Sequence, residues 1–393
     1  MNGTVSPGVD RGEADRGALR VADISVAAIR GNVARIRELA GEASVIVVVK
    51  AGGYGHGAVI AAEAAVAGGA AMIATVDLDE ALLLRAAGIE APLLCWLHGP
   101  RTDFAPAIEQ AIELGVSSLV QLEAIAAAAA TLGRAATVQF KVDTGLSRNG
   151  TPRAEWAALF ARGVELEREG LVRVRGVFSH LANAGRAADL AQAVLFDEAI
   201  DMLREAGSEP ELIHLSASDA VFDRPELRYT AVRVGLAAYG LSPFPDRSSA
   251  DLGLVPAMTL RSEIIAIREV PAGTGVSYGY THVAEEATTL ALVPIGYADG
   301  MPRGLSGSGL TVCIAGEARP IVGRIAMDQC VVDLGLLAGR VGVGEPVVFF
   351  GDPARGHSAV ERWAELLGTI NYEVLVGIGP RVVRRAIGSE TLP

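Results

Sequence analysis

Eight short apolar runs alternate with Ala- and Leu-rich helical segments, and this alternation constrains the fold more than any other feature of the chain. The runs span residues 45–49, 71–76, 93–97, 117–120, 138–142, 174–178, 212–215 and 231–234. Strands without a polar face must be covered on both faces, which is typical of parallel sheets with crossover helices. We therefore expect a closed (β/α)₈ barrel, with a doubly wound open sheet as the alternative.

The pattern changes near Leu254 to short β-rich runs separated by turn residues, which predicts a mainly antiparallel β domain. A chain of 393 residues is long enough for two domains. The first residues are polar and glycine-rich, and they lack the apolar segment that a signal peptide contains. We expect a flexible tail over residues 1–18, the barrel over 19–253 and the β domain over 254–393.

Composition excludes several classes of function. The net charge of −12 argues against nucleic-acid binding, which needs a basic stripe. No apolar stretch reaches the ~20 residues of a membrane span, so we expect a soluble, cytoplasmic protein. The three cysteines, Cys95, Cys313 and Cys330, are far apart and predict neither a disulfide framework nor a metal site.

Polar residues gather just beyond the predicted strands, where barrel enzymes place their active sites. They are Lys50, Tyr54, His56, Lys141, Asp143, Arg148, His180, Ser216, Ser218 and Arg233, together with Gly235. The amine of Lys50 could form a Schiff base with a carbonyl if burial or nearby cations lower its pKa. The alternative is a surface lysine that ends a strand.

Eight segments resemble, in the same order, the signature blocks of alanine racemases. They are VVVKAGGYGHG, FKVDTGLSRNG, VFSHLA, RVGLAAYG, GVSYGYT, LVPIGYADGMPR, GRIAMDQ and NYEV. The resemblance runs from about residue 20 to residue 384 and so covers nearly the whole chain.

The resemblance implies a pyridoxal 5′-phosphate enzyme whose cofactor forms an aldimine with Lys50. Arg233 would lie against the pyridine nitrogen and keep it unprotonated. The phosphate-side residues would be Tyr54, Ser218 and the backbone of Gly235. His180 would lie between the cofactor and the catalytic tyrosine.

Racemisation needs a proton removed from one face of Cα and returned on the other, so two bases are expected. The resemblance implies Lys50 for D-alanine and Tyr278 for L-alanine. Tyr278 would come from the partner subunit, which makes a homodimer with shared active sites. Arg148 would bind the substrate carboxylate, and Met327 would contact substrate through its backbone. In many relatives the lysine equivalent to Lys141 is carbamylated.

Some positions depart from the family pattern. Gly52 and Gly53 stand where Asn or Asp followed by Ala is common, and Ala217 stands where Asn is common. Gly185 replaces a frequent acidic residue, and Pro380 stands where some relatives have Tyr. Positions resembling the access channel are Tyr297, Arg303 and Arg324. The departures bear on cofactor affinity and channel selectivity.

Three alternatives compete with an alanine racemase, and the sequence argues against the second and third. A racemase of the same fold could act more broadly, on serine or basic amino acids. A basic amino-acid decarboxylase would carry a Cys-Glu-Ser-x-Asp block, which is absent here. A non-catalytic cofactor-binding barrel would usually lack the second domain. D-Alanine as product would imply a supply of peptidoglycan precursors.

Overall fold

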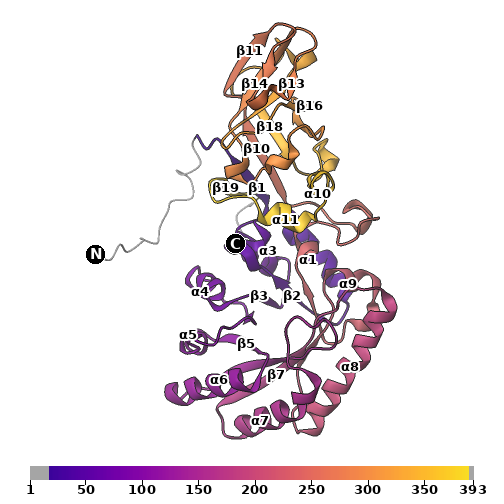
Figure 1. Ribbon diagram of the computed structural model, residues 1–393. Coiled ribbons are helices and arrows are strands. Elements are labelled where there is room, and N and C mark those ends of the chain that lie inside the picture. Colours follow the sequence, from indigo (N-terminus) through magenta and orange to yellow (C-terminus); the bar gives the residue numbers. More distant parts are fainter. Residues whose placement is uncertain (1–16, 389–393) are drawn as a thin grey trace, which may run out of the picture. The chain divides into compact units, whose positions relative to one another are not determined.

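The computed structural model describes residues 17–388 as two compact units (Figure 1). One unit contains residues 27–255, and the other combines the segment up to residue 26 with residues 256 onwards. Most of the expected tail, residues 1–16, lies outside the described residues.

Residues 27–255 form a closed barrel of eight parallel strands, which confirms the predicted barrel. The strands are β2 (Ser44–Val48), β3 (Met72–Thr75), β4 (Leu93–Cys95), β5 (Ile112–Val116), β6 (Ala136–Lys141), β7 (Val172–Phe178), β8 (Leu212–His214) and β9 (Ala231–Val234). In order around the barrel each strand pairs with the next, and β9 pairs with β2 to close it.

Helices surround these strands, as Figure 1 shows. They are α1 (Val26–Ala40), α2 (Lys50–Tyr54), α3 (Ala58–Ala67), α4 (Leu78–Ala86), α5 (Ala105–Glu109), α6 (Leu119–Leu132), α7 (Trp156–Arg168), α8 (Arg186–Glu205) and α9 (Ser218–Asp223). Short 3₁₀ turns occur at Arg153–Glu155, Pro225–Leu227, Leu236–Tyr239 and Ala250–Leu252.

The prediction of a strand at residues 117–120 is wrong. The fourth barrel strand is β5, Ile112–Val116, and the Ser118 side chain instead accepts a hydrogen bond from the Gln121 N–H as the N-cap of α6. Ser is a preferred N-cap residue because its oxygen satisfies a backbone N–H that has no partner within the helix. The charge of Glu113 interrupts the apolar pattern of β5, so the local sequence signal for this strand is weak.

The second unit contains a nine-stranded sheet, and its mainly antiparallel pairing confirms the predicted β domain. Its order is β11-β14-β17-β16-β15-β18-β10-β1-β19. The strands are β1 (Val21–Ser25), β10 (Met258–Glu263), β11 (Ala266–Val270), β14 (Thr288–Val293), β15 (Thr311–Ile314), β16 (Glu317–Val322), β17 (Cys330–Asp333), β18 (Pro346–Phe350) and β19 (Val383–Ile387).

Smaller elements complete this unit. They are the hairpin β12 (Gly275–Val276) and β13 (His282–Val283), and the helices α10 (Glu361–Leu367) and α11 (Asn371–Val376). The 3₁₀ turns are Tyr278–Tyr280, Tyr297–Asp299, Arg303–Leu305, Gly335–Leu337 and Pro353–Arg355.

Strand β1 belongs to this sheet and not to the barrel, so the barrel unit begins at Ala27 and not at residue 19. β1 pairs antiparallel with β10 and parallel with β19. Its Asp23 is buried, and its carboxylate lies 2.7 Å from Arg261 Nε of β10 and 2.7 Å from Arg385 of β19. The Asp23 carboxylate thus has an ion-pair partner on each of the two neighbouring strands.

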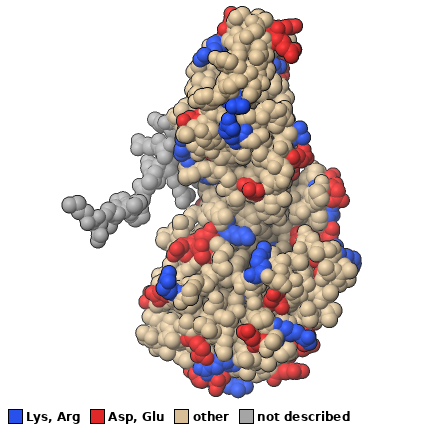
Figure 2. Space-filling model, viewed as in Figure 1, with Lys and Arg blue, Asp and Glu red and all other residues tan. Residues whose placement is uncertain are grey.

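Charged residues of both signs are interspersed on one face of the molecule (Figure 2). On the face seen in Figure 2, Lys and Arg lie among Asp and Glu. Arg162 illustrates this pairing, with nitrogens 2.6 Å from Glu123 and 2.7 Å from Glu165. Every helix within residues 17–388 is too short or too polar to cross a membrane.

Candidate active site

The chain leaves β2 through a turn of unusual handedness. Lys50 is followed by residues with positive φ: Ala51 (52°), Gly52 (62°), Gly53 (66°), Tyr54 (53°) and Gly55 (81°). A left-handed conformation costs L-residues about 1–2 kcal/mol each, and glycine avoids that cost. A Cβ at residue 53 would also approach the Ala61 Cβ to 3.0 Å. The two glycines that depart from the family pattern therefore suit this turn.

The carboxylate of Glu80 in α4 holds the turn. Its Oε1 accepts hydrogen bonds from the backbone N–H of Ala51 (2.6 Å) and of Gly52 (3.4 Å), and its Oε2 accepts one from Val76 (3.1 Å). Our sequence reasoning missed Glu80, because an acidic residue in the first turn of a helix is common for its interaction with the helix dipole. Glu80 is therefore a further residue that positions Lys50.

Three residues expected at the phosphate meet at one place. The backbone N–H of Gly235 donates to Ser218 Oγ (3.2 Å), as does that of Ala237 (3.4 Å). A Cβ at residue 235 would lie 2.1 Å from the Tyr54 hydroxyl oxygen. Tyr54, Ser218 and Gly235 thus bring two hydroxyl groups and a backbone amide together, a group suited to a phosphate.

Arg233 in β9 is buried, and its terminal nitrogens are used within the barrel. Nη1 donates to His214 Nδ1 (2.9 Å) and to the His214 carbonyl (2.8 Å). Nη2 donates to the Ser179 carbonyl (2.6 Å) and to His180 Nδ1 (3.2 Å). No hydrogen bond runs from its Nε to an acceptor among residues 17–388, where its bonds are all from Nη1 and Nη2. Sequence reasoning missed His214. Its one indication in the sequence is that a histidine interrupts an otherwise apolar run.

Positive charge accumulates in this site. Burial lowers the pKa of Lys50, and the charges of Arg148 and Arg233 lower it further, against the opposing charge of Glu80. Burial and the charges of Arg233, Arg148 and Lys50 lower the pKa of Lys141 to about 8. Burial first, and then Arg233, lower the pKa of His180 to about 3, so its ring is neutral. Mutually repelling cations favour an anionic ligand.

Arg148 follows a loop that Asp143 shapes. The Asp143 carboxylate accepts hydrogen bonds from the backbone N–H of Gly145 (2.9 Å) and of Ser147 (3.1 Å). The loop returns to β6 where the Thr151 N–H donates to the Lys141 carbonyl (2.8 Å). Asp143 thus positions the loop that leads to Arg148.

Two other residues expected at the strand ends pack within the barrel unit. The ring of His56 stacks on Tyr239 at 4.5 Å between centroids, and the Ser216 hydroxyl donates to the Leu227 carbonyl (2.6 Å). Both His56 and Ser216 are buried. Their geometry indicates structural roles.

The remaining departures differ in their surroundings. Gly185 precedes α8 with φ of 100°, which favours glycine. Ala217 precedes α9 and provides no side-chain cap. Pro380 is exposed.

The second unit carries Tyr278 in a short turn between β12 and β13. Its side chain is 69% exposed. The preceding Ser277 donates from Oγ to the Arg324 carbonyl (2.6 Å), and a Cβ at Gly279 would lie 3.2 Å from Arg324 Nη1. The Tyr278 turn therefore packs against the segment that leads to Met327.

Met327 and Tyr297 occupy adjoining loops of this unit. The Met327 carbonyl accepts a hydrogen bond from Ala298 (2.9 Å), and the Tyr297 N–H donates to the Ala326 carbonyl (3.1 Å). Both side chains are partly exposed, at 52% for Met327 and 42% for Tyr297. Arg303 and Arg324 line one groove together with His282.

Comparison with known proteins agrees with these features. Residues 24–243 match the family model "Alanine racemase, N-terminal domain", and residues 257–386 match "Alanine racemase, C-terminal domain". The chain is 49% identical to an alanine racemase of Mycolicibacterium smegmatis over 92% of this chain and 93% of that protein. It is 46% identical to one of Mycobacterium avium over 94% and 95%.

Solved structures agree as well. The alanine racemase of Streptomyces lavendulae, a D-cycloserine producer, superposes with a TM-score of 0.90 at 44% identity, covering 94% of this chain and 97% of that one. That of Streptomyces coelicolor superposes with a TM-score of 0.91 at 42% identity, covering 96% and 100%. With both units matched and relatives similar over nearly their whole length, this chain belongs to the alanine racemase family.

Proposed function

We propose that this protein interconverts L-alanine and D-alanine with pyridoxal 5′-phosphate held at Lys50. One observation carries the proposal: the whole chain has only two lysines, Lys50 and Lys141, and both lie in the positively charged site of the barrel. Every other cationic side chain at neutral pH is an arginine, which cannot supply a primary amine. Both side chains that carry a primary amine therefore lie in the site where the Schiff base is proposed to form.

The residues of the barrel fit this cofactor. The amine of Lys50 would hold it covalently, and Tyr54, Ser218 and the Gly235 N–H would bind its phosphate. The unpaired Nε–H of Arg233 would donate to the ring nitrogen. When bound, the cofactor withdraws electrons from the substrate and makes the proton on Cα removable.

Lys50 would move the proton on one face of Cα, on the D-alanine side. Its lowered pKa favours the neutral amine that a base requires. Burial lowers the pKa of Arg233 to about 9, so its guanidinium stays charged at neutral pH. It would donate a hydrogen bond to the ring nitrogen of the bound cofactor without protonating it. Arg148 would bind the substrate carboxylate as a bidentate partner.

Tyr278 of a second copy of the chain would act on the opposite face, on the L-alanine side. Tyr278 is 69% exposed and so accessible to another chain, and the Met327 backbone on an adjoining loop would contact the substrate. The protein would then be a homodimer in which each site needs both copies. A cytoplasmic enzyme of this kind would supply D-alanine for peptidoglycan precursors.

The cofactor site is tested by borohydride reduction of the loaded protein, followed by peptide mass spectrometry. We expect a pyridoxyl group on the peptide that contains Lys50. The matched variants are Lys50→Arg, which should lose both the label and racemisation, and Lys141→Arg, which should keep the label. A label on Lys141, or none on the wild type, would refute the proposed attachment.

The substrate is tested by incubating the protein with single L-amino acids and separating the enantiomers by chiral chromatography. Alanine should turn over fastest. Faster turnover of serine, lysine or arginine would favour a broader racemase of the same fold.

A further inference from the structure

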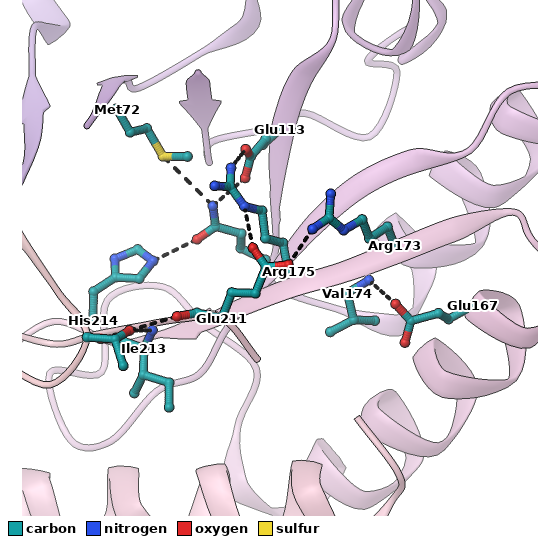
Figure 3. Close-up of polar contacts among 11 residues, drawn as sticks. Met72, Glu113, Glu167, Arg173, Val174, Arg175, Glu211, Ile213 and His214 are labelled. Atoms are coloured by element: carbon teal, nitrogen blue, oxygen red, sulfur yellow. Dashed lines mark hydrogen bonds and ion pairs between the residues drawn. The ribbon is translucent and has the colours of Figure 1, made fainter. Parts of the chain in front are cut away.

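A row of buried polar side chains leads from Arg233 across the barrel interior, and most of it is visible in Figure 3. His214 Nε2 lies 2.7 Å from Gln139 Oε1, and Gln139 Nε2 lies 2.6 Å from Glu113 Oε2. Glu113 in turn forms an ion pair with Arg175. Gln139 and His214 have no exposed surface, and Glu113 is 6% exposed. None of the racemase chemistry proposed above uses Glu113 or Gln139.

The row has a direction that follows from donor and acceptor chemistry. An ionised Glu113 only accepts hydrogen bonds, so Gln139 turns its NH₂ toward Glu113 and its carbonyl toward His214. A carbonyl also only accepts, so the His214 proton is on Nε2. Its bare Nδ1 then accepts the hydrogen bond from Arg233.

Charge and burial support this assignment. Burial lowers the pKa of His214 well below its ordinary value, so the ring is neutral and carries one proton. Burial raises the pKa of Glu113, and the hydrogen bond from Gln139 and the charge of Arg175 act against that rise. The ion pair with Arg175 thus favours the ionised carboxylate at the end of the row.

The backbone makes room for the row. Strand β7 lies between β6, which carries Gln139, and β8, which carries His214. The β6–β7 register shifts between Val138 and Gln139, so that Gln139 lies opposite Gly176 of β7. A Cβ at residue 176 would lie 3.0 Å from Gln139 Oε1 and 2.5 Å from the Leu212 carbonyl oxygen. Glycine at this position lets the amide reach across β7 to His214.

We propose that Glu113 and Gln139 are positioning residues for the racemase reaction, which act by holding His214 as the Nε2–H tautomer. In that tautomer His214 accepts from Arg233 and holds the guanidinium with its Nε–H toward the cofactor. In the other tautomer, His214 Nδ1–H would face an Arg233 N–H, and two donors would oppose each other. This inference rests on the proposed function.

The tautomer of His214 is the first readout. Histidine is labelled with ¹⁵N in the full-length protein, which has six histidines, and the His214 signals are assigned by their loss in His214→Asn. We expect the Nε2–H form alone in the wild type and a second form in Gln139→Leu. Gln121→Leu is the control, since Gln121 makes its hydrogen bonds to Ser117 and His98 outside the row.

Kinetics of the loaded enzyme are the second readout. Gln139→Leu should lower kcat by about tenfold or more, by analogy with the loss of the outer hydrogen-bond partner of a metal-ligating histidine, and leave the KM for alanine near the wild-type value. Glu167→Gln is a control for loss of a carboxylate, because Glu167 accepts a hydrogen bond from Val174 (2.8 Å) on the same strand as Arg175.

A double variant tests the direction of the row. In Glu113→Gln with Gln139→Glu, the new carboxylate can accept from His214 and from the new amide, whose oxygen can accept from Arg175. We expect it to restore the tautomer and kcat relative to either single variant. The tautomer is measured without substrate, so a wild type that fails to racemise alanine would refute the proposed function and leave this test valid.

Three outcomes would overturn the inference, given variants that are folded by circular dichroism. The first is a wild-type His214 protonated on Nδ1. The second is a Gln139→Leu protein with an unchanged tautomer and kcat. The third is a double variant no better than the poorer single one.

Discussion

The phenol of Tyr54 occupies the space in which a side chain at Gly235 would begin. A Cβ at residue 235 would lie 2.1 Å from the Tyr54 hydroxyl oxygen and 2.6 Å from its Cζ. The φ of Gly235 is −111°, so this close approach, and not backbone handedness, requires glycine. The contact joins the end of β9 to the turn that follows Lys50, and it forms the proposed phosphate site.

Gly235→Ala should therefore weaken cofactor binding by displacing Tyr54. We expect the Kd for pyridoxal 5′-phosphate to rise by about tenfold, equal to about 1.4 kcal/mol. Titration of cofactor-free protein, followed by absorbance, measures this change. Gly31→Ala is the control, because a Cβ there meets no atom within 4 Å. Equal affinities in the two variants would contradict a phosphate site at Gly235.

Tyr278→Phe should abolish racemisation and leave cofactor absorbance intact. Loss of a general base lowers kcat by about 10²–10⁴-fold. Lys50 would remain, so the variant should still exchange the α-proton of D-alanine with deuterated water while L-alanine does not exchange. The control is Tyr280→Phe, since the two tyrosines are equally exposed, at 69% and 70%. Unchanged activity in Tyr278→Phe would mean that the second base is elsewhere.

Mixing inactive variants tests whether each site is shared between copies. A dimer of Lys50→Ala with Tyr278→Phe would contain one site with both residues intact, so activity should return on mixing. If both bases belonged to one chain, the mixed sample would stay inactive.

Lys141 should react with CO₂ to form a carbamate. Its pKa of about 8 leaves an appreciable neutral fraction, and the neutral amine adds CO₂ and releases one proton. At fixed dissolved CO₂ the initial rate should rise about tenfold per pH unit up to about pH 8 and then level off. Native mass spectrometry should show an increment of one CO₂ that disappears in acid and in Lys141→Gln. A wild-type protein of unmodified mass under these conditions would exclude the carbamate.

His180 should make the protein less stable in mild acid. Its pKa is about 3 in the folded chain against an ordinary 6.5, so between these pH values the unfolded chain binds a proton that the folded chain does not. Stability is therefore lost as the pH falls through this range, by at most about 1.4 kcal/mol per pH unit from this residue. Urea unfolding of wild type and His180→Asn between pH 6.5 and 4 should show a shallower loss in the variant. Parallel curves would contradict this account.

The local sequence predicted most barrel strands, because a fully buried parallel strand is apolar throughout and has a recognisable length. It failed at β5 and β1, where a polar residue interrupts the pattern. Glu113 of β5 finds its partners Gln139 and Arg175 at separations of 26 and 62 residues, and Asp23 of β1 finds Arg385 at 362. Because the partners that neutralise these buried carboxylates are far away in the chain, a window of a few residues gives no indication that the segment is a buried strand.

The amino-acid sequence by itself determined where primary amines can act, since only positions 50 and 141 carry lysine, and it determined the order of the segments around them. The tertiary structure decided the rest. The left-handed turn after Lys50 is held by Glu80 of another helix, and the proton on His214 follows from Gln139 and Glu113 on other strands. These hydrogen bonds join residues that become neighbours only when the strands close into a barrel. Burial strengthens those between His214, Gln139 and Glu113.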